Sequence, residues 1–287
     1  MHILWVQDYN VFAFPGGAER NDRRIIHEGI RRGHDITMEF DSNWDCAVIS
    51  NCVTIEDELM DQICNKKKHI FFMHDYIFCR YRLFFPCLDK CKRCPFMLMW
   101  KKRFLDSKLI IYLSPLHKEF HERVMPELKD IPNILIPSTV EPSKFKICES
   151  MTKLPNTGMS INSLLPFKGA ERTLDFITKH PEIQFQIISP NPENFLIPPN
   201  TEIVCSKLPY DHLIGMLGSS EFYVELPETP QPYNRTFAEA KLAGCKVITN
   251  ELSGAASYPW FSNRQRLIQE LLAAPTNFWK GVEEYGQ

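Results

Sequence analysis

The residues best suited to hold an anion stand at a helix start that the sequence predicts within residues 225–250. Three prolines exclude a helix and a central strand from the first part of this stretch: Pro227, Pro230 and Pro232. Apolar residues then recur at helical spacing, and Gly244 stands where a helix ends. The helix therefore begins near Arg235 and carries Glu239 one turn in. Its first N–H groups and positive dipole end suit an anion, and Arg235 adds a charge there.

A histidine and a lysine are further candidates for chemistry. The apolar run before His74 predicts a buried strand, which delivers His74 and Asp75 to its carboxyl end. An imidazole there can donate to a hydroxyl or shuttle a proton, or it can be a purely structural residue. Lys168, which precedes Gly169 at another predicted helix start, is either a second binding cation or an ordinary surface lysine.

Two adjacent glycines, Gly16 and Gly17, open a predicted helix after the first strand. A backbone without Cβ atoms can approach a ligand closely. The alternative is a tight turn with no ligand.

Four cysteines fall within sixteen residues: Cys79, Cys87, Cys91 and Cys94. The last two have the Cys-x-x-Cys spacing of a chelating pair, and four thiolates suit tetrahedral zinc. Free thiols in an irregular insertion are the alternative. A zinc here would be structural, because four protein ligands leave no open position for a substrate.

The composition is that of an ordinary protein of two domains. The chain has 287 residues, 44% of them hydrophobic and 24% charged, and a net charge of −2. With this net charge the chain as a whole is not basic, so its composition does not indicate nucleic-acid binding. No apolar run reaches the length of a membrane span, and the first residues lack the pattern of a signal peptide. A cytoplasmic location, or the host cytoplasm for a viral protein, is therefore the default expectation.

The candidate residues require a scaffold of parallel strands alternating with helices. Apolar runs predict strands at 2–6, 35–40, 46–50, 69–74, 108–113, 133–137, 158–162, 185–189, 202–206, 221–225 and 246–249. A strand, glycine turn, helix and strand in this order indicate a doubly wound α/β fold, whose ligands bind at the carboxyl ends of the strands. Residues 141–156 read as a polar linker, and 263–285 as a helix broken at Pro275.

Several motifs together resemble GT-B glycosyltransferases of the large retaining nucleotide-sugar family. They are GGAER, the His-Asp strand end, Lys168-Gly169 and RTFAEA, in the family's order. That family has two glutamates eight positions apart. Glu239-Ala240 and Gly244 match the second half of this signature, whereas the first glutamate falls on Gln231. Asn234-Arg235-Thr236 is similar to the Gly-Arg-Thr of some phage and bacterial members, which can also be short.

The resemblance implies two Rossmann-like domains facing a cleft. Residues 1–145 would form the acceptor-side domain, 146–262 the nucleotide-sugar domain, and 263–287 a helical tail that packs back toward the first domain. An arginine that family members carry shortly before the lysine falls on Asn162 or Ser163, so that Arg235 would replace its charge.

The resemblance also implies roles for individual residues. Lys168 and Arg235 would stabilise the departing diphosphate, with His74 as a third catalytic residue at the donor sugar. Glu239 would bind the ribose and Gln231 the sugar hydroxyls. The full set of implied substrate-binding residues is Gly16, Gly17, Asp75, Gln231, Asn234, Thr236 and Glu239. No metal cofactor is implied for catalysis, and the nucleotide sugar is a substrate.

The implied activity is transfer of a sugar from a nucleotide sugar to a hydroxyl of a polysaccharide or glycan, with retention. A first alternative is transfer to hydroxymethylated bases of phage DNA. That activity needs a basic groove, for which a candidate cluster exists: Arg80, Arg82, Lys90, Lys92, Arg93, Lys101, Lys102 and Arg103. A second alternative is an inactive protein that binds a sugar nucleotide or a polysaccharide.

Overall fold

The computed structural model describes residues 1–13, 16–40, 43–52, 54–66, 68–80, 94–161, 164–189, 195–205 and 208–287. The chain divides into two compact units. The first unit comprises Met1–Thr139 and Leu272–Gln287, and the second Val140–Leu271. Each unit holds one parallel sheet between helices, so the predicted α/β class with two Rossmann-like sheets is confirmed.

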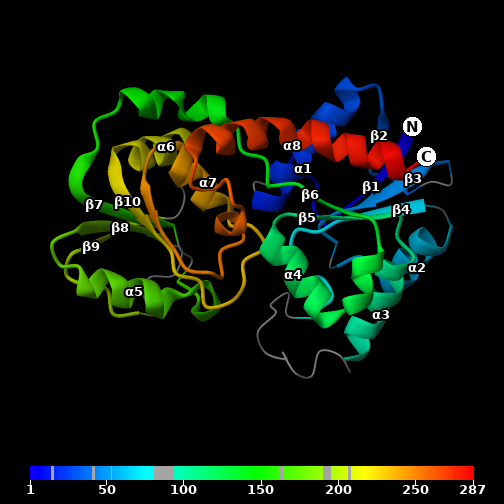
Figure 1. The fold of residues 1–287 in the computed structure, drawn as a ribbon, viewed down its shortest axis with the longest axis horizontal. Helices are drawn as coiled ribbons and strands as arrows, with labels where there is room; N and C mark the ends of the chain where they lie inside the picture. Colours follow the sequence, from blue (N-terminus) through cyan, green and yellow to red (C-terminus); the bar gives the residue numbers. More distant parts are fainter. Residues whose placement is uncertain are drawn as a thin grey trace. The chain divides into compact units, whose positions relative to one another are not determined.

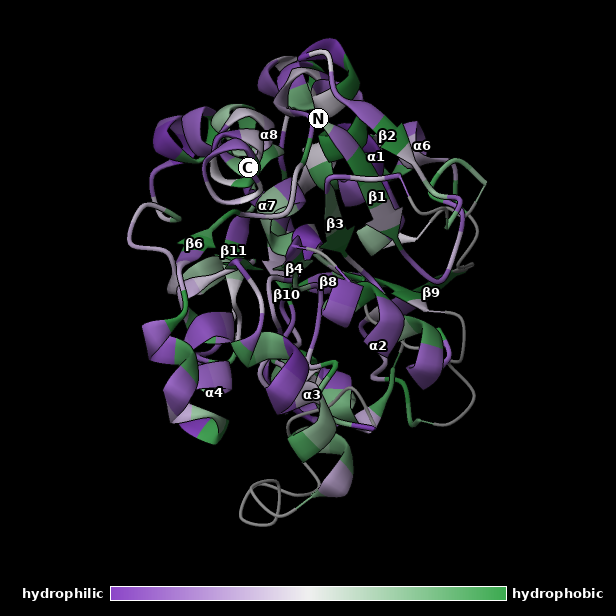
Figure 2. Cartoon of the chain, turned by 90° about the vertical axis from the view of Figure 1, so that its right-hand side faces the viewer, coloured by the Kyte–Doolittle hydropathy of each residue, from purple (hydrophilic) through white to green (hydrophobic). Residues whose placement is uncertain are grey.

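The first unit contains a six-stranded parallel sheet in the order β2-β1-β3-β4-β5-β6. Its strands coincide with the first six predicted apolar runs, because strands covered on both faces read as continuous apolar runs. The strands are β1 His2–Val6, β2 Asp35–Thr37, β3 Cys46–Ile49, β4 Lys68–Phe72, β5 Leu109–Tyr112 and β6 Asn133–Leu135. The hydrophobic colouring of β3 in Figure 2 illustrates this buried character.

Helices cover both faces of this sheet (Figure 1). One face carries α1 Gly17–Arg31 and the last part of α8 Arg264–Tyr285, and the other carries α2 Asp57–Lys66, α3 Pro95–Leu105 and α4 Pro115–Val124. A short 3₁₀ helix, η2 Pro126–Asp130, follows α4. The start of α4 is as predicted, since Pro115 occupies its first turn and the Ser114 hydroxyl accepts from the His117 amide at 3.1 Å.

The second unit contains a five-stranded parallel sheet in the order β11-β10-β7-β8-β9. Its strands are β7 Leu154–Ile161, β8 Gln184–Ser189, β9 Thr201–Cys205, β10 Ser220–Val224 and β11 Lys246–Ile248. Helix α5 Ala170–Lys179 lies on one face, and α6 Tyr210–Ser219 and α7 Arg235–Leu242 lie on the other (Figure 1). The chain reverses its direction of winding between β7 and β10, the position where doubly wound sheets bind ligands.

The prediction of an irregular linker over 141–156 is wrong for most of its length. A 3₁₀ helix, η3 Pro142–Ser150, occupies its first part, and β7 already begins at Leu154. The buried residues of η3 are Pro142, Phe145 and Cys148. Their spacing of three is the period of a 3₁₀ helix, so the segment has a buried face that a search for α-helical periodicity does not detect.

The predicted break at Pro275 is also wrong, since α8 continues through it. Proline removes the N–H that would bond the carbonyl of Leu271. The helix persists because apolar residues on both sides of the proline are buried along one stripe: Leu267, Leu271, Ala274, Phe278 and Val282. The two units divide between Leu271 and Leu272, at the carbonyl that the proline leaves without its helical partner.

The last part of α8 belongs to the core of the first unit. The indole N–H of Trp279 donates to the carbonyl of Ile25 at 2.6 Å, and its ring stacks on His34 at 4.7 Å. A Cβ at Gly29 would lie 2.2 Å from the Trp279 ring, so α1 requires a glycine at this contact. Among the described residues, no helix is both long and apolar enough to cross a membrane.

Candidate functional site

The predicted site residues fall into two groups, one in each unit. The group in the second unit lies at the switch point between β7 and β10. Lys168 ends the short 3₁₀ helix η4 Pro166–Lys168, which follows β7, and Glu225 follows β10 directly. Gln231 lies in the proline-containing loop after β10, and Arg235 is the first residue of α7, as predicted.

Gly169 explains why Lys168 approaches this loop. Its backbone has a φ of 75°, and a Cβ there would lie 1.8 Å from the carbonyl oxygen of Leu226. Any other residue would separate the two segments, because this φ and this space both favour glycine. The amide of Thr229 also donates to the carbonyl of Phe167 at 3.2 Å. The segment around Lys168 is therefore attached to the loop that follows β10.

Lys168 and Gln231 are in direct contact. The Lys168 ammonium donates to Gln231 Oε1 at 2.7 Å. The Gln231 amide nitrogen donates to the carbonyl and the hydroxyl of Thr229 at 3.1 and 3.2 Å, which orients the side-chain oxygen toward the lysine. A glutamate at this position would pair with the ammonium as an ion, whereas the neutral amide leaves the positive charge in place.

Arg235 and Glu239 form a buried pair. Arg235 Nε donates to Glu239 Oε1 at 2.7 Å, and the Tyr210 hydroxyl donates to the same oxygen at 2.8 Å. Burial alone would lower the pKa of Arg235, but the Glu239 carboxylate beside it raises the pKa above its ordinary value. The guanidinium is therefore charged. Its Nη1 is buried and has no hydrogen-bond partner among the described residues.

Glu225 is a residue that sequence reasoning missed. It is 3% exposed, and the Tyr223 hydroxyl lies 2.9 Å from its Oε2 and 3.0 Å from the Thr236 hydroxyl. Thr236 in turn donates to Asn234 Oδ1 at 2.6 Å. Asn234 precedes α7 with a left-handed φ of 64°. This network of hydrogen bonds therefore holds the start of α7. The sequence signal that could have identified Glu225 is a carboxylate directly after an apolar strand.

The group in the first unit centres on His74. His74 Nε2 lies 2.7 Å from Asp22 Oδ1, and Ser50 donates to Asp22 Oδ2 at 2.5 Å. The side chains of His74 and Asp22 are 6% and 1% exposed. Because a carboxylate only accepts, Nε2 carries the hydrogen and Nδ1 is the imidazole's acceptor. This is the arrangement in which an imidazole can take a proton from a hydroxyl.

Asp22 and Ser50 were also missed by sequence reasoning. Asp22 shares one buried stripe of α1 with Ile25, Ile26 and Gly29. A carboxylate on such a stripe must find a partner in the interior, which is a signal the sequence contains. Ser50 directly follows β3, so the carboxyl ends of β3 and β4 and the start of α1 converge on one cluster.

The remaining predicted residues of the first unit lie near the same edge of the sheet. Gly16 precedes α1 with an extended backbone, and no heavy atom lies within 4 Å of a Cβ built on Gly17. Neither glycine needs a left-handed conformation. The open space beside Gly17 is what a ligand would need to approach the backbone closely. The backbone carbonyl of Asp75 accepts from His117 Nε2 at 3.4 Å.

Part of the predicted zinc site lies outside the described residues, namely Cys87 and Cys91. Of the other two members, Cys79 is buried and Cys94 is partly buried. In the ranges that the structure describes, no group of three or more His, Cys, Asp or Glu side chains is arranged to hold a metal ion. The structural zinc therefore stays a prediction.

One member of the predicted basic cluster is buried in the core of the first unit. Arg103 is 3% exposed and donates to Asp61 Oδ1 at 2.8 Å and to Asp57 Oδ1 at 3.1 Å, so it cannot face a nucleic acid. Lys101 pairs with Glu127 at 2.6 Å. Four other members lie outside the described residues: Arg82, Lys90, Lys92 and Arg93.

Neither protein-family models nor curated proteins match this sequence. Solved structures match it over nearly the whole chain. Sucrose-phosphate synthase from Thermosynechococcus elongatus has a TM-score of 0.61 at 10% identity, covering 99% of this chain and 94% of its own. HepE from Anabaena, in complex with UDP-glucose, has the same score and identity, covering 99% and 95%. Trehalose-6-phosphate synthase OtsA has a TM-score of 0.58 at 10% identity, covering 100% and 94%.

These neighbours are GT-B glycosyltransferases. At such low identities the likeness establishes the fold and not the activity. The chain therefore has the GT-B fold, as the sequence predicted.

Proposed function

We propose that this protein transfers a sugar from a nucleotide sugar to an acceptor hydroxyl. The fold supports this proposal, since the structure of HepE, one of its neighbours, contains UDP-glucose. The site in the second unit supports it independently, because its residues suit a diphosphate and a ribose.

The observation that carries the proposal is the state of Arg235. Its guanidinium is charged, and its Nη1 is buried without a partner in the described part of the chain. A buried donor in this state is rare, because leaving it unsatisfied costs about 1–3 kcal/mol. An anion at the start of α7 would accept from Nη1 and from the first backbone N–H groups of the helix.

The chemistry follows from the charges at the site. In the reaction, the bond between the anomeric carbon and the diphosphate oxygen breaks, and a bond to the acceptor oxygen forms. Negative charge grows on the departing diphosphate, and Lys168 and Arg235, which Gln231 and Glu239 hold in place, would stabilise it. The acceptor hydroxyl loses its proton, for which the diphosphate oxygen or His74 Nδ1 is the recipient.

The roles of the other residues are also proposals. Glu239 Oε1 already accepts from Arg235 and Tyr210, so the ribose hydroxyls would bind at Oε2. Gln231 would bind the hydroxyls of the donor sugar. Retention of configuration and a cytoplasmic location belong to the same proposal, which does not depend on the class of acceptor. The reaction is expected to persist in a chelator, because protein cations stabilise the leaving group.

Release of nucleoside diphosphate from a panel of nucleotide sugars tests the proposal. We expect release from at least one donor by the full-length protein, and a decrease of about tenfold to a few hundredfold in Arg235→Ala, the effect of losing roughly 1.5–3 kcal/mol of charge-assisted contact. Lys246→Ala, which removes an exposed lysine of the same unit, is the matched control. Tight donor binding without release from any donor would instead indicate an inactive binding protein.

A further inference from the structure

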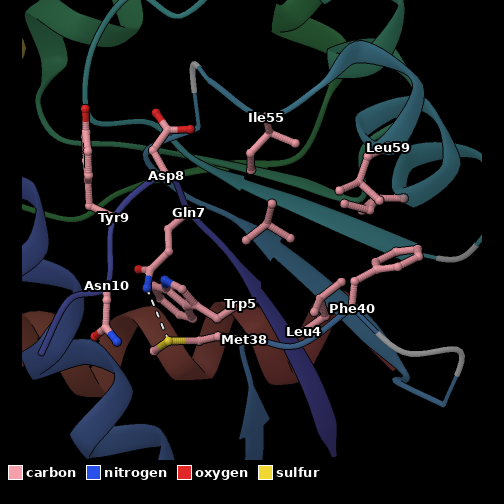
Figure 3. Close-up of a pocket in the computed structure, with 12 residues that line it drawn as sticks. Leu4, Trp5, Gln7, Asp8, Tyr9, Asn10, Met38, Phe40, Ile55 and Leu59 are labelled. Carbon is pink, nitrogen blue, oxygen red and sulfur yellow. Dashed lines mark hydrogen bonds between the residues drawn. The ribbon is translucent and has the colours of Figure 1, made fainter.

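The first unit contains a pocket that the proposed donor site does not use. It has a volume of about 310 Å³ and lies beside β1 (Figure 3). Its walls come from β1, from the segment that follows β2, and from α2 with the residue Ile55 before it. Such a volume is within the range of small-molecule sites.

The pocket exists because β2 is shorter than β1. Their pairing ends at Leu4 and Thr37, whereas on its other side β1 stays paired with β3 as far as Val6 and Ile49. After Thr37 the chain continues as Met38–Phe40 and forms a wall of the pocket instead of a strand. The last residues of β1 therefore border a cavity where the sheet would otherwise continue.

The lining of the pocket is divided by polarity. Its four polar residues are consecutive and follow β1 directly: Gln7, Asp8, Tyr9 and Asn10. The rest of the lining is apolar, with Leu4 on β1, Phe40 after β2 and Leu59 on α2 as examples. Figure 3 shows Ile55, Leu59 and Phe40 together on one side, with Gln7 and Asn10 on the other.

Three features mark the pocket as a binding site. Two aromatic residues of the lining, Tyr9 and Phe40, are 46% and 39% exposed, so apolar surface stays open to solvent at the pocket. Gln7 Oε1 is buried with no hydrogen-bond partner in the described ranges, although Gln7 Nε2 donates to Met38 Sδ at 3.2 Å. The indole N–H of Trp5, another lining residue, is also unsatisfied there.

We propose that this pocket binds an alcohol with an apolar body, an aryl or alkyl group that carries a hydroxyl, and that this alcohol is the acceptor of the transfer. The apolar body lies between β1 and α2. The hydroxyl lies at the carboxyl end of β1, where it donates to Gln7 Oε1. The acceptor role rests on the proposed function, whereas the binding does not.

The polar edge of the pocket adjoins the His74 cluster. The amide of Asp8 donates to the carbonyl of Asn51 at 2.8 Å, and the neighbouring Ser50 donates to the carboxylate that orients His74. Asp8 Oδ1 also accepts from the Thr54 amide at 2.8 Å. The loop after β1 is thereby attached to the loop after β3, at the switch point of this sheet, where doubly wound folds bind ligands.

A free carbohydrate fits the pocket less well. A sugar carries hydroxyls around its whole ring, and those facing Leu4, Ile55 and Leu59 would lose water without gaining a partner. An apolar body with one polar end matches the division of the lining.

Calorimetric titration of the full-length protein with naphthol, naphthalene and maltose tests the proposal. We expect naphthol to bind. Leu59→Trp, which fills the pocket, should weaken that binding at least tenfold, and Phe40→Ala, a substitution at a half-exposed position, should weaken it severalfold. Leu98→Trp, at an exposed leucine of α3 outside the pocket, is the matched control and should leave it unchanged.

Gln7→Leu tests the position of the hydroxyl. It should weaken naphthol binding roughly two- to tenfold, the equivalent of one hydrogen bond, and should leave naphthalene binding unchanged or tighter. The proposal is overturned if naphthol does not bind, if Leu59→Trp and Leu98→Trp act alike, or if maltose binds more tightly than naphthol.

Binding of nucleoside diphosphate, measured on the same variants, separates this proposal from the proposed function. Diphosphate binding without naphthol binding contradicts only the pocket. With an active donor, mass spectrometry should detect a naphthyl glycoside, and its formation should fall in Leu59→Trp. Naphthol binding without any glycoside, while another acceptor is glycosylated, would contradict the acceptor role.

Discussion

At the scale of single residues, two buried carboxylates of the second unit have different surroundings. Glu239 lies against the Arg235 guanidinium at 2.7 Å. Glu225 has hydroxyl partners, and its burial raises its pKa, although Lys168 and the hydroxyls act in the opposite direction. Glu225 is therefore the carboxylate whose ionisation opposes folding.

Glu225→Gln should change how stability depends on pH. A carboxyl whose pKa is raised in the folded state stabilises the protein below its ordinary pKa of 4.5, and this contribution is lost as pH rises through the folded-state pKa. Glutamine does not ionise, so the variant should lose less stability than the parent as pH increases above about 4.5. Denaturant unfolding at a series of pH values measures the difference.

Glu221→Gln, on strand β10 that precedes Glu225, is the control with the opposite sign. The hydrogen bond with Lys246 lowers the pKa of Glu221, so the carboxylate stabilises the folded protein above its ordinary pKa of 4.5. At pH values above about 4.5, Glu221→Gln should therefore be less stable than the parent. Identical pH profiles for the two variants would contradict the assignment of Glu225 as a destabilised carboxylate.

Asp22→Asn should impair His74 without affecting the donor site. An amide can donate to or accept from Nε2, so the imidazole loses its fixed tautomer. We expect turnover to fall about tenfold to a hundredfold, with the affinity for nucleoside diphosphate unchanged. Steady-state kinetics and calorimetry give the two values. Ser50→Ala, which keeps the contact between His74 and Asp22, should have the smaller effect, and the reverse order would exclude Asp22 as a positioning residue.

At the scale of elements, the sequence correctly predicted the helix starts that are determined by residues adjacent in the chain. The start of α4 follows from Ser114 and Pro115, and the start of α7 at Arg235 follows from the prolines before it and the apolar spacing after it. The two errors have another origin. The 3₁₀ helix at Pro142–Ser150 and the continuous α8 both depend on burial against other segments, which outweighs a polar composition and a proline.

Helix α4 should make the first unit sensitive to acid. Burial lowers the pKa of His121 from 6.5 to about 4, and that of His117 well below its ordinary value. Unfolded histidines bind protons below about pH 6.5, whereas the folded ones stay neutral, so stability should fall as pH decreases from 6.5 toward 4. For His121 the loss is roughly 3 kcal/mol over that range.

His121→Phe tests this expectation, because phenylalanine fills the space between Tyr76 and Tyr112 without titrating. Its stability should vary less with pH between 6.5 and 4 than that of the parent. His180→Phe, at an exposed histidine, should follow the parent. If the profile of His121→Phe also follows the parent, buried histidines are not the source of the acid sensitivity.

At the scale of the whole molecule, the order of apolar strands and helices was enough to predict two Rossmann-like sheets. The candidate site was predictable only in part. Lys168, Gln231, Arg235 and Glu239 could be placed by motif, whereas the partners of each site come from distant segments: Tyr210 for Glu239 and Asp22 for His74. Such partners are determined by packing, which motifs do not encode.

The end of the chain completes the core of the first unit. Trp279 is fully buried between α1 and β1, where it contacts Trp5 and donates to Ile25. Trp279→Ala should therefore lower the free energy of unfolding by about 3–5 kcal/mol. Leu272→Ala, at a position of α8 that is 58% exposed, should change it by less than about 0.5 kcal/mol. Equal losses in chemical denaturation would mean that the end of α8 is not part of this core.

The central claim is that Lys168 and Arg235 bind the diphosphate of a nucleotide sugar. Calorimetry with uridine, UMP and UDP on the parent, Lys168→Ala, Arg235→Ala and the control Lys246→Ala tests it most directly. The account predicts that the two site variants bind UDP about tenfold or more weakly while uridine binding is nearly unchanged, since each removes a charge-assisted contact to phosphate of roughly 1.5–3 kcal/mol. Parent-like binding of every ligand by both folded variants, or no binding of any nucleoside diphosphate by the parent, would contradict it.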